Sequence, residues 1–336
     1  MKTERLRLRA PALVLVFAAF LPAYPAGRRP EPAPQTGKSV ESPSAPSDPI
    51  PGRLQEVPLD GRGGGVIAYS VTSSKDENQI FLVNGDGSGQ RKITGVSGRA
   101  CGPDWSPDGS RIAFYNHFND QTWSLFVMRA DGGDVRRLTN TPSVWDAVPR
   151  WSPKGTMIAF SRTYPGDGYR SEIWTVPAAG GFPRRLGAGP GNGPCWSKGG
   201  DKILFFAPVG SASEIFEMDA DGSRPRPLTH LGAETVWPKY SPDNSRIAFE
   251  SNMDGDPEIF VMDADGSRIN QLTRNGAEDG APEWSFDGKT IVFVSNRDGR
   301  YEIYAIEADG SRPRRITKTS GHAVQPDVKP AGIRNK

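Results

Sequence analysis

The chain has 336 residues, which is enough for one large domain or two small ones. A net charge of +2 favours neither a nucleic-acid nor a membrane partner, and two Cys and three His exclude a disulfide framework and a Cys/His metal cluster. Gly and Pro, at 39 and 31 residues, are typical of a chain with many short turns or a disordered segment.

The N-terminus has the pattern of a targeting segment. Four basic residues among the first nine precede an apolar run over residues 10–23, which has the length of a signal-peptide core and is short for a membrane span. We predict residues 1–26 to be a signal peptide or an uncleaved N-terminal anchor. The protein is then exported to the periplasm or cell exterior, or held at the inner membrane. Residues 27–64, rich in Pro, Ser and Gly, are predicted to form a disordered tether.

A repeat of 44 to 46 residues organises the chain that follows. Its marker is an aromatic residue two positions after a Pro and seven positions before an aliphatic residue: Trp105, Trp151, Trp196, Tyr240 and Trp284. Each unit has four short apolar or alternating segments, joined by turn sequences such as Ser-Pro-Asp-Gly and Asp-Gly-Ser. Units of this length with four strands are typical of β-propeller blades.

The two ends of the repeat predict how the ring closes. The first unit, which starts at residue 65, has no initial strand, and a matching segment occurs at the C-terminus, where Val328 lies 44 residues after Trp284. The fold class is therefore predicted to be all-β. We expect a six-bladed propeller over residues 65–330, made of four-stranded antiparallel blades. The C-terminal strand closes the ring and leaves residues 331–336 as a tail, because an open ring would expose unpaired strand edges.

The repeated residues resemble the TolB-type propeller of bacterial WD-like proteins. The pattern P-x-W-S-P-D-G-x-x-I-A-F, followed by E-I-Y-V-M-D-A-D-G-S, is matched closely by residues 246–273, and the resemblance covers residues 65 to 330. The resemblance implies a periplasmic partner-binding protein of the cell envelope. It also implies an α/β domain ahead of the propeller, where this sequence has the tether. Related propellers belong to prolyl-peptidase-like hydrolases, but no G-x-S-x-G motif occurs here.

Link lengths predict which face of the ring binds a partner. The links from first to second strand and from third to fourth strand are constant in length, whereas the other two kinds vary and carry many aromatic residues. The face formed by the variable links, together with the channel mouth, is the predicted binding surface. Its candidate residues are Tyr115, Trp145, Tyr164, Tyr169, Trp237 and His322. Trp145 and Trp237 are expected to precede first strands. The alternative is that these aromatic residues cover the ends of the core between blades.

A second set of candidates is expected to line the central channel. The position before the marker aromatic is charged in five of the six units: Asp104, Arg150, Lys239, Glu283 and Asp327. These side chains either grip a peptide terminus or polar ligand, or neutralise one another in a water-filled channel.

No residue pattern indicates catalysis. The Asp-Gly turns lack the remaining ligands of a calcium loop, and the three His are expected to lie apart, so we predict no catalytic residues, no metal and no cofactor. The sequence favours a monomeric, non-catalytic scaffold that binds an envelope protein or peptide, with no nucleic-acid partner and no membrane contact beyond a possible anchor. The alternative is an enzyme, or a propeller that binds a sugar or peptide in its polar channel.

Overall fold

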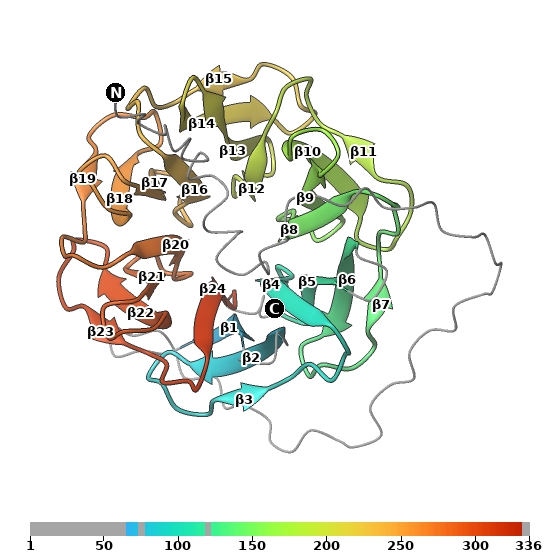
Figure 1. The fold of residues 1–336 in the computed structure, drawn as a ribbon, viewed down its shortest axis with the longest axis horizontal. Helices are drawn as coiled ribbons and strands as arrows, with labels where there is room; N and C mark the ends of the chain where they lie inside the picture. The colour runs from blue at the N-terminus through green and yellow to red at the C-terminus, as the bar shows by residue number, and fades with distance from the viewer. Residues whose placement is uncertain (1–64, 73–77, 118–121, 331–336) are drawn as a thin grey trace, which may run out of the picture. The chain divides into compact units, whose positions relative to one another are not determined.

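The computed structural model describes residues 65–72, 78–117 and 122–330, and these residues confirm the predicted all-β propeller. Six antiparallel sheets of four strands each surround a common centre as blades (Figure 1). None of the described residues belongs to a helix long and apolar enough to cross a bilayer. The targeting segment at 1–26, the tether at 27–64 and the tail at 331–336 lie outside the described residues.

The four strands of each blade follow one another outward from the centre of the ring. The innermost strands are β4 (Arg99–Trp105), β8 (Trp145–Trp151), β12 (Asn192–Trp196), β16 (Thr235–Tyr240), β20 (Asp279–Trp284) and β24 (His322–Val328). The second strands are β1 (Val66–Thr72), β5 (Arg111–His117), β9 (Met157–Tyr164), β13 (Lys202–Val209), β17 (Arg246–Ser251) and β21 (Thr290–Ser295). The third strands are β2 (Asn78–Asn84), β6 (Trp123–Arg129), β10 (Arg170–Pro177), β14 (Ala212–Asp219), β18 (Glu258–Asp263) and β22 (Glu302–Glu307). The outermost strands are β3 (Arg91–Lys92), β7 (Arg136–Arg137), β11 (Arg184–Arg185), β15 (Arg226–Pro227), β19 (Asn270–Gln271) and β23 (Arg314–Arg315).

The C-terminal strand closes the ring as predicted. Strand β24 pairs antiparallel with β1, with Val328 opposite Ile67 and Ala323 opposite Val71. The first and last parts of the ring thus share one blade, blade 1, and the others are numbered 2 to 6 in chain order. Figure 1 shows β24 beside β1 at the inner edge of this blade. Neither end of the ring therefore presents an unpaired inner strand.

Just beyond the short outermost strands, a side chain takes part in the pairing with the third strand. In five blades a Thr hydroxyl just beyond the outermost strand accepts the N–H at the start of the third strand, at 2.9–3.0 Å, as Thr317 does for Ile303. The same Thr is buried in each of these blades. A short edge strand offers little backbone for pairing with another chain.

The hydrophobic core lies between neighbouring blades. The marker residues Trp105 and Trp284 are buried, and each packs with apolar side chains of its own blade and of the blade before it. Between blades 5 and 6, for example, Trp284 and Phe293 pack with Ala248 and Val261. Because each blade buries one face on the next, the inner strands are held in fixed positions around the centre.

Candidate functional site

Every innermost strand contains a bulge that sets the direction of its side chains. The bulge residue has a left-handed backbone, with φ between 50° and 60°, at Gly102, Val148, Gly193, Trp237, Ala281 and Gln325. Pairing with the second strand shifts register at the same place in each blade. A bulge leaves one residue out of the ladder, so its N–H needs another acceptor.

A side chain from the preceding blade supplies that acceptor at three of the six seams between blades. Gly102 donates its N–H to Ser70, Gly193 to Ser161 and Ala281 to Glu250, each at 3.0 Å. These acceptors occupy the same position of the repeat, on the second strand. It lies three residues after the Ile that pairs with the marker position of the first strand. The same position in the other blades holds Tyr115, Phe206 and Val294.

The five charged candidates of the central channel meet at the centre of the ring. Nη1 of Arg150 lies 2.8 Å from Asp104, 3.4 Å from Asp327 and 3.6 Å from Glu283. Lys239 lies 2.5 Å from Glu283. Since Arg150 belongs to blade 3 and Glu283 to blade 6, these contacts join opposite sides of the ring. The geometry is that of the alternative in which the charges neutralise one another.

Three carboxylates face two cations in this central group. Burial raises the pKa of Asp104 against the opposing effect of Arg150. Burial and the neighbouring Asp104 and Glu283 hold the pKa of Asp327 well above its usual range. Burial alone would lower the pKa of Arg150, but the surrounding carboxylates raise it, so the guanidinium stays charged. In this group a carboxyl therefore takes up a proton more readily than Arg150 loses one.

The centre also joins consecutive blades through backbone bonds. Asp104 accepts the N–H of Trp151 at 2.6 Å, and Asp327 accepts the N–H of Trp105 at 2.7 Å. Both carboxylates thus bind the following blade as well as Arg150. A polar ligand entering the centre would have to replace these contacts.

The aromatic candidates of blade 3 gather at the variable-loop face. Trp145 opens β8, Tyr164 ends β9, and Tyr169 directly precedes β10 with a φ of 60°. The rings of Trp145 and Tyr169 lie 5.5 Å apart, and Tyr169 is 56% exposed. Tyr164 donates to Glu172 at 3.0 Å and lies under the guanidinium of Arg170, 4.7 Å from its ring centre. Blade 3 thus presents an aromatic pair, in which Tyr169 is exposed and Trp145 is half-buried, beside a fixed tyrosine.

The remaining aromatic candidates lie elsewhere. Trp237 is the bulge residue of β16, and its ring meets Phe206 of blade 4 edge-on at 5.2 Å. Both Trp145 and Trp237 lie within first strands, so the expectation that they precede those strands is wrong. Tyr115 is buried, 4% exposed, with Gln325 donating to its hydroxyl at 2.7 Å. A buried ring presents little surface, so we leave Tyr115 out of the proposed binding surface.

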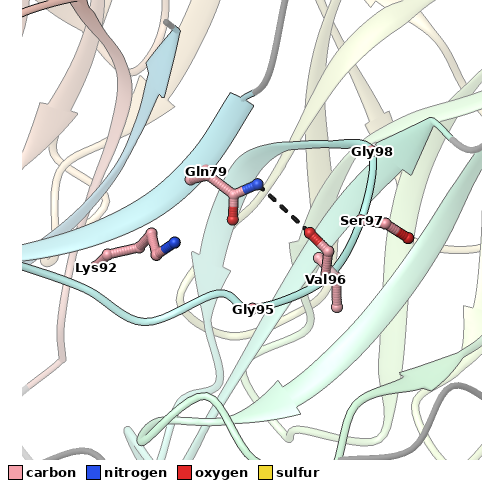
Figure 2. Close-up of a pocket in the computed structure, with 6 residues that line it drawn as sticks. All are labelled: Gln79, Lys92, Gly95, Val96, Ser97 and Gly98. Atoms are coloured by element: carbon pink, nitrogen blue, oxygen red, sulfur yellow. Dashed lines mark hydrogen bonds between the residues drawn. The ribbon is translucent and has the colours of Figure 1, made fainter. Parts of the chain in front are cut away.

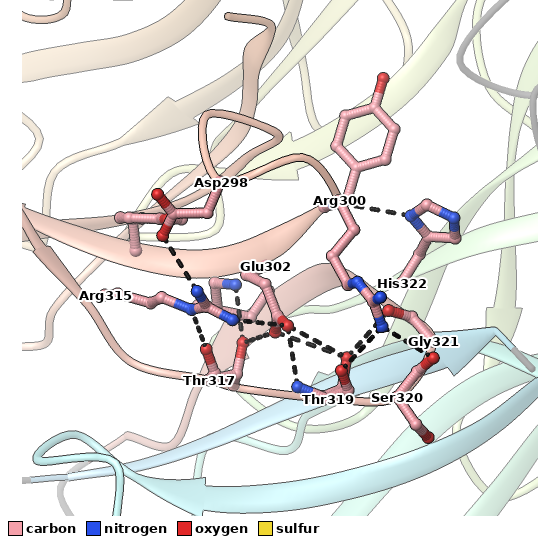
Figure 3. Close-up of polar contacts among 12 residues, drawn as sticks. Asp298, Arg300, Glu302, Arg315, Thr317, Thr319, Ser320, Gly321 and His322 are labelled. Carbon is pink, nitrogen blue, oxygen red and sulfur yellow. Dashed lines mark hydrogen bonds and ion pairs between the residues drawn. The ribbon is translucent and has the colours of Figure 1, made fainter.

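His322 opens the closing strand and belongs to a polar network at the seam between blades 6 and 1 (Figure 3). Its Nδ1 accepts the N–H of Tyr301 at 3.3 Å. Beside it, Glu302 accepts bonds from Thr317 at 2.6 Å and from the N–H of Thr319 at 2.8 Å. Arg315 pairs with the same carboxylate at 3.0 Å. A buried carboxylate is thus fully compensated at this seam.

Exposed apolar side chains also occur on the opposite face. Phe182, 97% exposed, lies between β10 and β11, and Phe286, 46% exposed, lies between β20 and β21. They belong to separate blades, and neither has an aromatic partner among the described residues, unlike Trp145 and Tyr169. Single exposed apolar residues are normal on protein surfaces.

A cavity of about 310 Å³ lies on blade 1, away from the central group (Figure 2). It is lined by Gln79, Lys92 and residues 95–98, and the amide of Gln79 donates to the carbonyl of Val96 at 3.4 Å. Among the described residues that line it, Lys92 has the single ionisable side chain. General acid–base or metal chemistry needs several convergent groups, and the described lining supplies one.

Glu250 is the notable residue that the sequence analysis missed. It lies at the seam position where the other blades place Ser, Tyr, Phe or Val, and it is 6% exposed. The signal that could have found it is the repeat itself, because three residues after Ile247 an acid replaces neutral residues.

Comparisons with known proteins support the fold. The TolB protein of the Tol-Pal system from Nitratidesulfovibrio vulgaris is 35% identical over 83 residues, which are 24% of this chain and 19% of that protein. An uncharacterized peptidase, YuxL of Bacillus subtilis, is 31% identical over 101 residues, 30% of this chain and 15% of that protein. The matched region is thus less than a fifth of either relative.

The structural likeness extends over more of the chain. The crystal structure of TolB from Acinetobacter baumannii superposes with a TM-score of 0.70 at 19% identity, covering 81% of this chain and 69% of that one. A family model described as the TolB beta propeller domain matches residues 65–239 and 233–334. Because these matches cover most of the sequence, the chain belongs to the TolB beta propeller domain family.

Proposed function

We propose that this protein is a non-catalytic, exported propeller scaffold that binds a protein or peptide partner in the cell envelope through its variable-loop face. The observation that carries the proposal is the pair formed by Trp145 and Tyr169, whose rings lie 5.5 Å apart at this face. Large aromatic side chains that are already ordered bury much area at a small cost in conformational entropy, which makes them effective anchors. Tyr169 is 56% exposed, so much of its ring is available to a partner.

Neighbouring blades extend this surface. Val209 ends β13 and Met253 follows β17, both at the variable-loop face, and they are 48% and 37% exposed. With Tyr169 they place exposed side chains on the consecutive blades 3, 4 and 5. The name of the TolB relative, which assigns it to the Tol-Pal system, agrees with a partner in the envelope.

The central group supports a scaffold more than an enzyme or a channel that binds a sugar or peptide. Its five charged side chains pair with one another across the ring, and Asp104 and Asp327 also hold the backbone of the next blade. A ligand at the centre would have to break buried ion pairs, which costs several kcal/mol each. We therefore assign Arg150, Lys239 and the three carboxylates a structural role.

The test is cross-linking capture from an envelope extract. Three baits are compared: the natural chain, a Trp145→Ala, Tyr169→Ala variant, and a Phe182→Ser variant that removes an exposed aromatic residue from the opposite face. The proposal predicts one partner that the natural chain and the Phe182→Ser variant capture alike and that the folded double variant loses. Equal capture by all three, or a loss with Phe182→Ser, would contradict the assigned face.

A further inference from the structure

The seam between blades 5 and 6 contains a buried carboxylate that the fold makes room for. Glu250 on β17 points to the start of β20, where its Oε2 accepts the N–H of Ala281 at 3.0 Å. A Cβ on Gly280 would lie 2.3 Å from the same oxygen, so a residue larger than Gly would displace the carboxylate. The space for Glu250 therefore depends on Gly280.

No cation compensates this carboxylate within the part of the chain that the structure describes. Its Oε1 has no hydrogen-bond partner there, and no Lys or Arg pairs with it. Two further acids face it, Glu278 and Glu234, and both act on it as like charges. Glu234 itself has a buried oxygen, Oε2, without a partner among these residues. Three carboxylates thus lie at one seam, and the described residues supply no ion pair to Glu250.

The groups around this site are either engaged or acidic. Arg297 pairs with Asp279 at 2.7 Å and lies against the rings of Phe293 and Tyr304. The hydroxyl of Tyr301 donates to Glu278. These contacts leave the excess of negative charge at Glu250 in place.

Other buried carboxylates at the variable-loop face show what is absent here. Glu302, at the next seam, pairs with Arg315, and Glu172 on blade 3 pairs with Arg170 and Arg185. Each of these two carboxylates obtains its cation from within the chain, whereas Glu214 and Glu258, at the same position of the repeat, accept hydrogen bonds and have no ion pair among the described residues. Burial of an ionised carboxylate without a cation costs free energy. A cation from outside the chain would reduce this cost for Glu250.

We propose that the site formed by Glu250, Glu234 and Glu278 binds a cationic group of the partner, an ammonium or guanidinium from a Lys, an Arg or a chain N-terminus. This inference rests on the proposed function and adds the chemistry of the partner's contact. The three acids belong to the variable-loop face, because Glu250 lies near the end of β17 and the other two directly precede β16 and β20. An incoming cation would gain from the buried carboxylate of Glu250 and from the two acids beside it.

The ionisation of Glu250 agrees with this assignment. Burial, then the charges of Glu278 and Glu234, raise the pKa of its carboxyl to about 7, although the bond from Ala281 opposes the shift. In the part of the chain that the structure describes, the hydroxyl of Tyr301 also interacts with Glu250. A bound cation favours the carboxylate and would lower this pKa.

The test uses argininamide as the probe and the backbone amide of Ala281 as the reporter. The amide donates directly to Glu250, so its NMR chemical shift follows the state of this carboxyl. We expect argininamide to shift the signal saturably near pH 8 and to lower the pKa of Glu250. The control is Nα-acetylcitrulline amide, which has a urea in place of the guanidinium and carries no charge, and it should do neither.

Two variants make the result specific. Glu250→Gln should weaken argininamide binding about tenfold or more, while Asp265→Asn, which removes an exposed carboxylate on the opposite face, should leave it unchanged. Equal responses to both amides, equal binding by Glu250→Gln, or a response to Ca²⁺ but not to argininamide would overturn the inference. In that case the protein-binding proposal would survive if the captured partner still required Trp145 and Tyr169 while ignoring Glu250→Gln.

Discussion

Two groups of carboxylates lie near the inner strands, and they are neutralised to very different degrees. At the centre, Asp104, Glu283 and Asp327 share Arg150 and Lys239. At the seam between blades 5 and 6, Glu250 faces two further acids and has no ion pair among the described residues.

The comparison separates charges that stabilise the ring from a charge that the ring does not need. The central side chains come from five different blades and hold one another and the backbone, so they contribute to closure of the ring. The carboxylate of Glu250 accepts one N–H that Ser accepts at two other seams, and its charge is not required for that bond. A buried charge that the fold does not need is a candidate for function.

Removing the strand that carries Asp327 should break the central group most severely. Deletion of residues 322–336 removes β24, leaves the inner edge of β1 unpaired and takes one carboxylate from Arg150. We expect loss of cooperative thermal unfolding, measured by calorimetry. Deletion of residues 331–336 alone serves as the control and should leave the transition in place. An unchanged melting temperature after the longer deletion would contradict closure by β24.

Substitution of the central cation tests the compensated group directly. Arg150→Met leaves three carboxylates with Lys239 alone and should lower the free energy of unfolding by about 3–5 kcal/mol. Since burial raises the pKa of Asp104 and Asp327, their protonation relieves the repulsion, and the loss should be larger at pH 8 than at pH 5. Urea unfolding at the two pH values measures both effects, and a loss independent of pH would speak against charge as its cause.

Neutralising the uncompensated carboxylate should have the opposite sign. The folded pKa of Glu250, about 7, is raised above its ordinary value of 4.5, so the folded state loses stability as pH rises from about 4.5 to 7. Glu250→Gln removes this penalty and should raise the free energy of unfolding by up to about 3 kcal/mol above pH 7, with no gain near pH 4. Urea unfolding across this pH range measures the difference. A destabilised variant at pH 8 would show that Glu250 has a counter-charge.

The smallest effect concerns an exposed member of the same seam. Glu278→Gln should change the free energy of unfolding by less than about 1 kcal/mol, because this carboxylate is exposed. It should nevertheless lower the pKa of Glu250, since one like charge is removed. The pH titration of the Ala281 amide signal detects this shift, and an unchanged midpoint would mean that the two acids do not interact.

The repeat made most of the fold predictable from the sequence. The marker residues and turn sequences identified six blades, and the match of Val328 to the repeat identified the closing strand. The central charges were found because the position before the marker is regular. Which of them pair was not predictable, because Arg150 reaches Glu283 across the ring and such distances depend on closure.

Local strand geometry limited the prediction of the binding surface. The bulge in each inner strand places Trp237 inside β16, against Phe206, although it was expected in a link. Tyr115 is buried by contacts with Gln325, a residue 210 positions away in the sequence. Glu250 was overlooked because its role depends on Gly280 and Ala281 of the next blade.

The most direct test of the proposed binding face is site-specific photo-cross-linking in cells. A photoreactive amino acid replaces Tyr169 in one sample and Phe182, the most exposed aromatic residue of the opposite face, in the other. The account predicts a discrete cross-linked partner from position 169 and none from position 182. A partner captured from position 182 alone would contradict it.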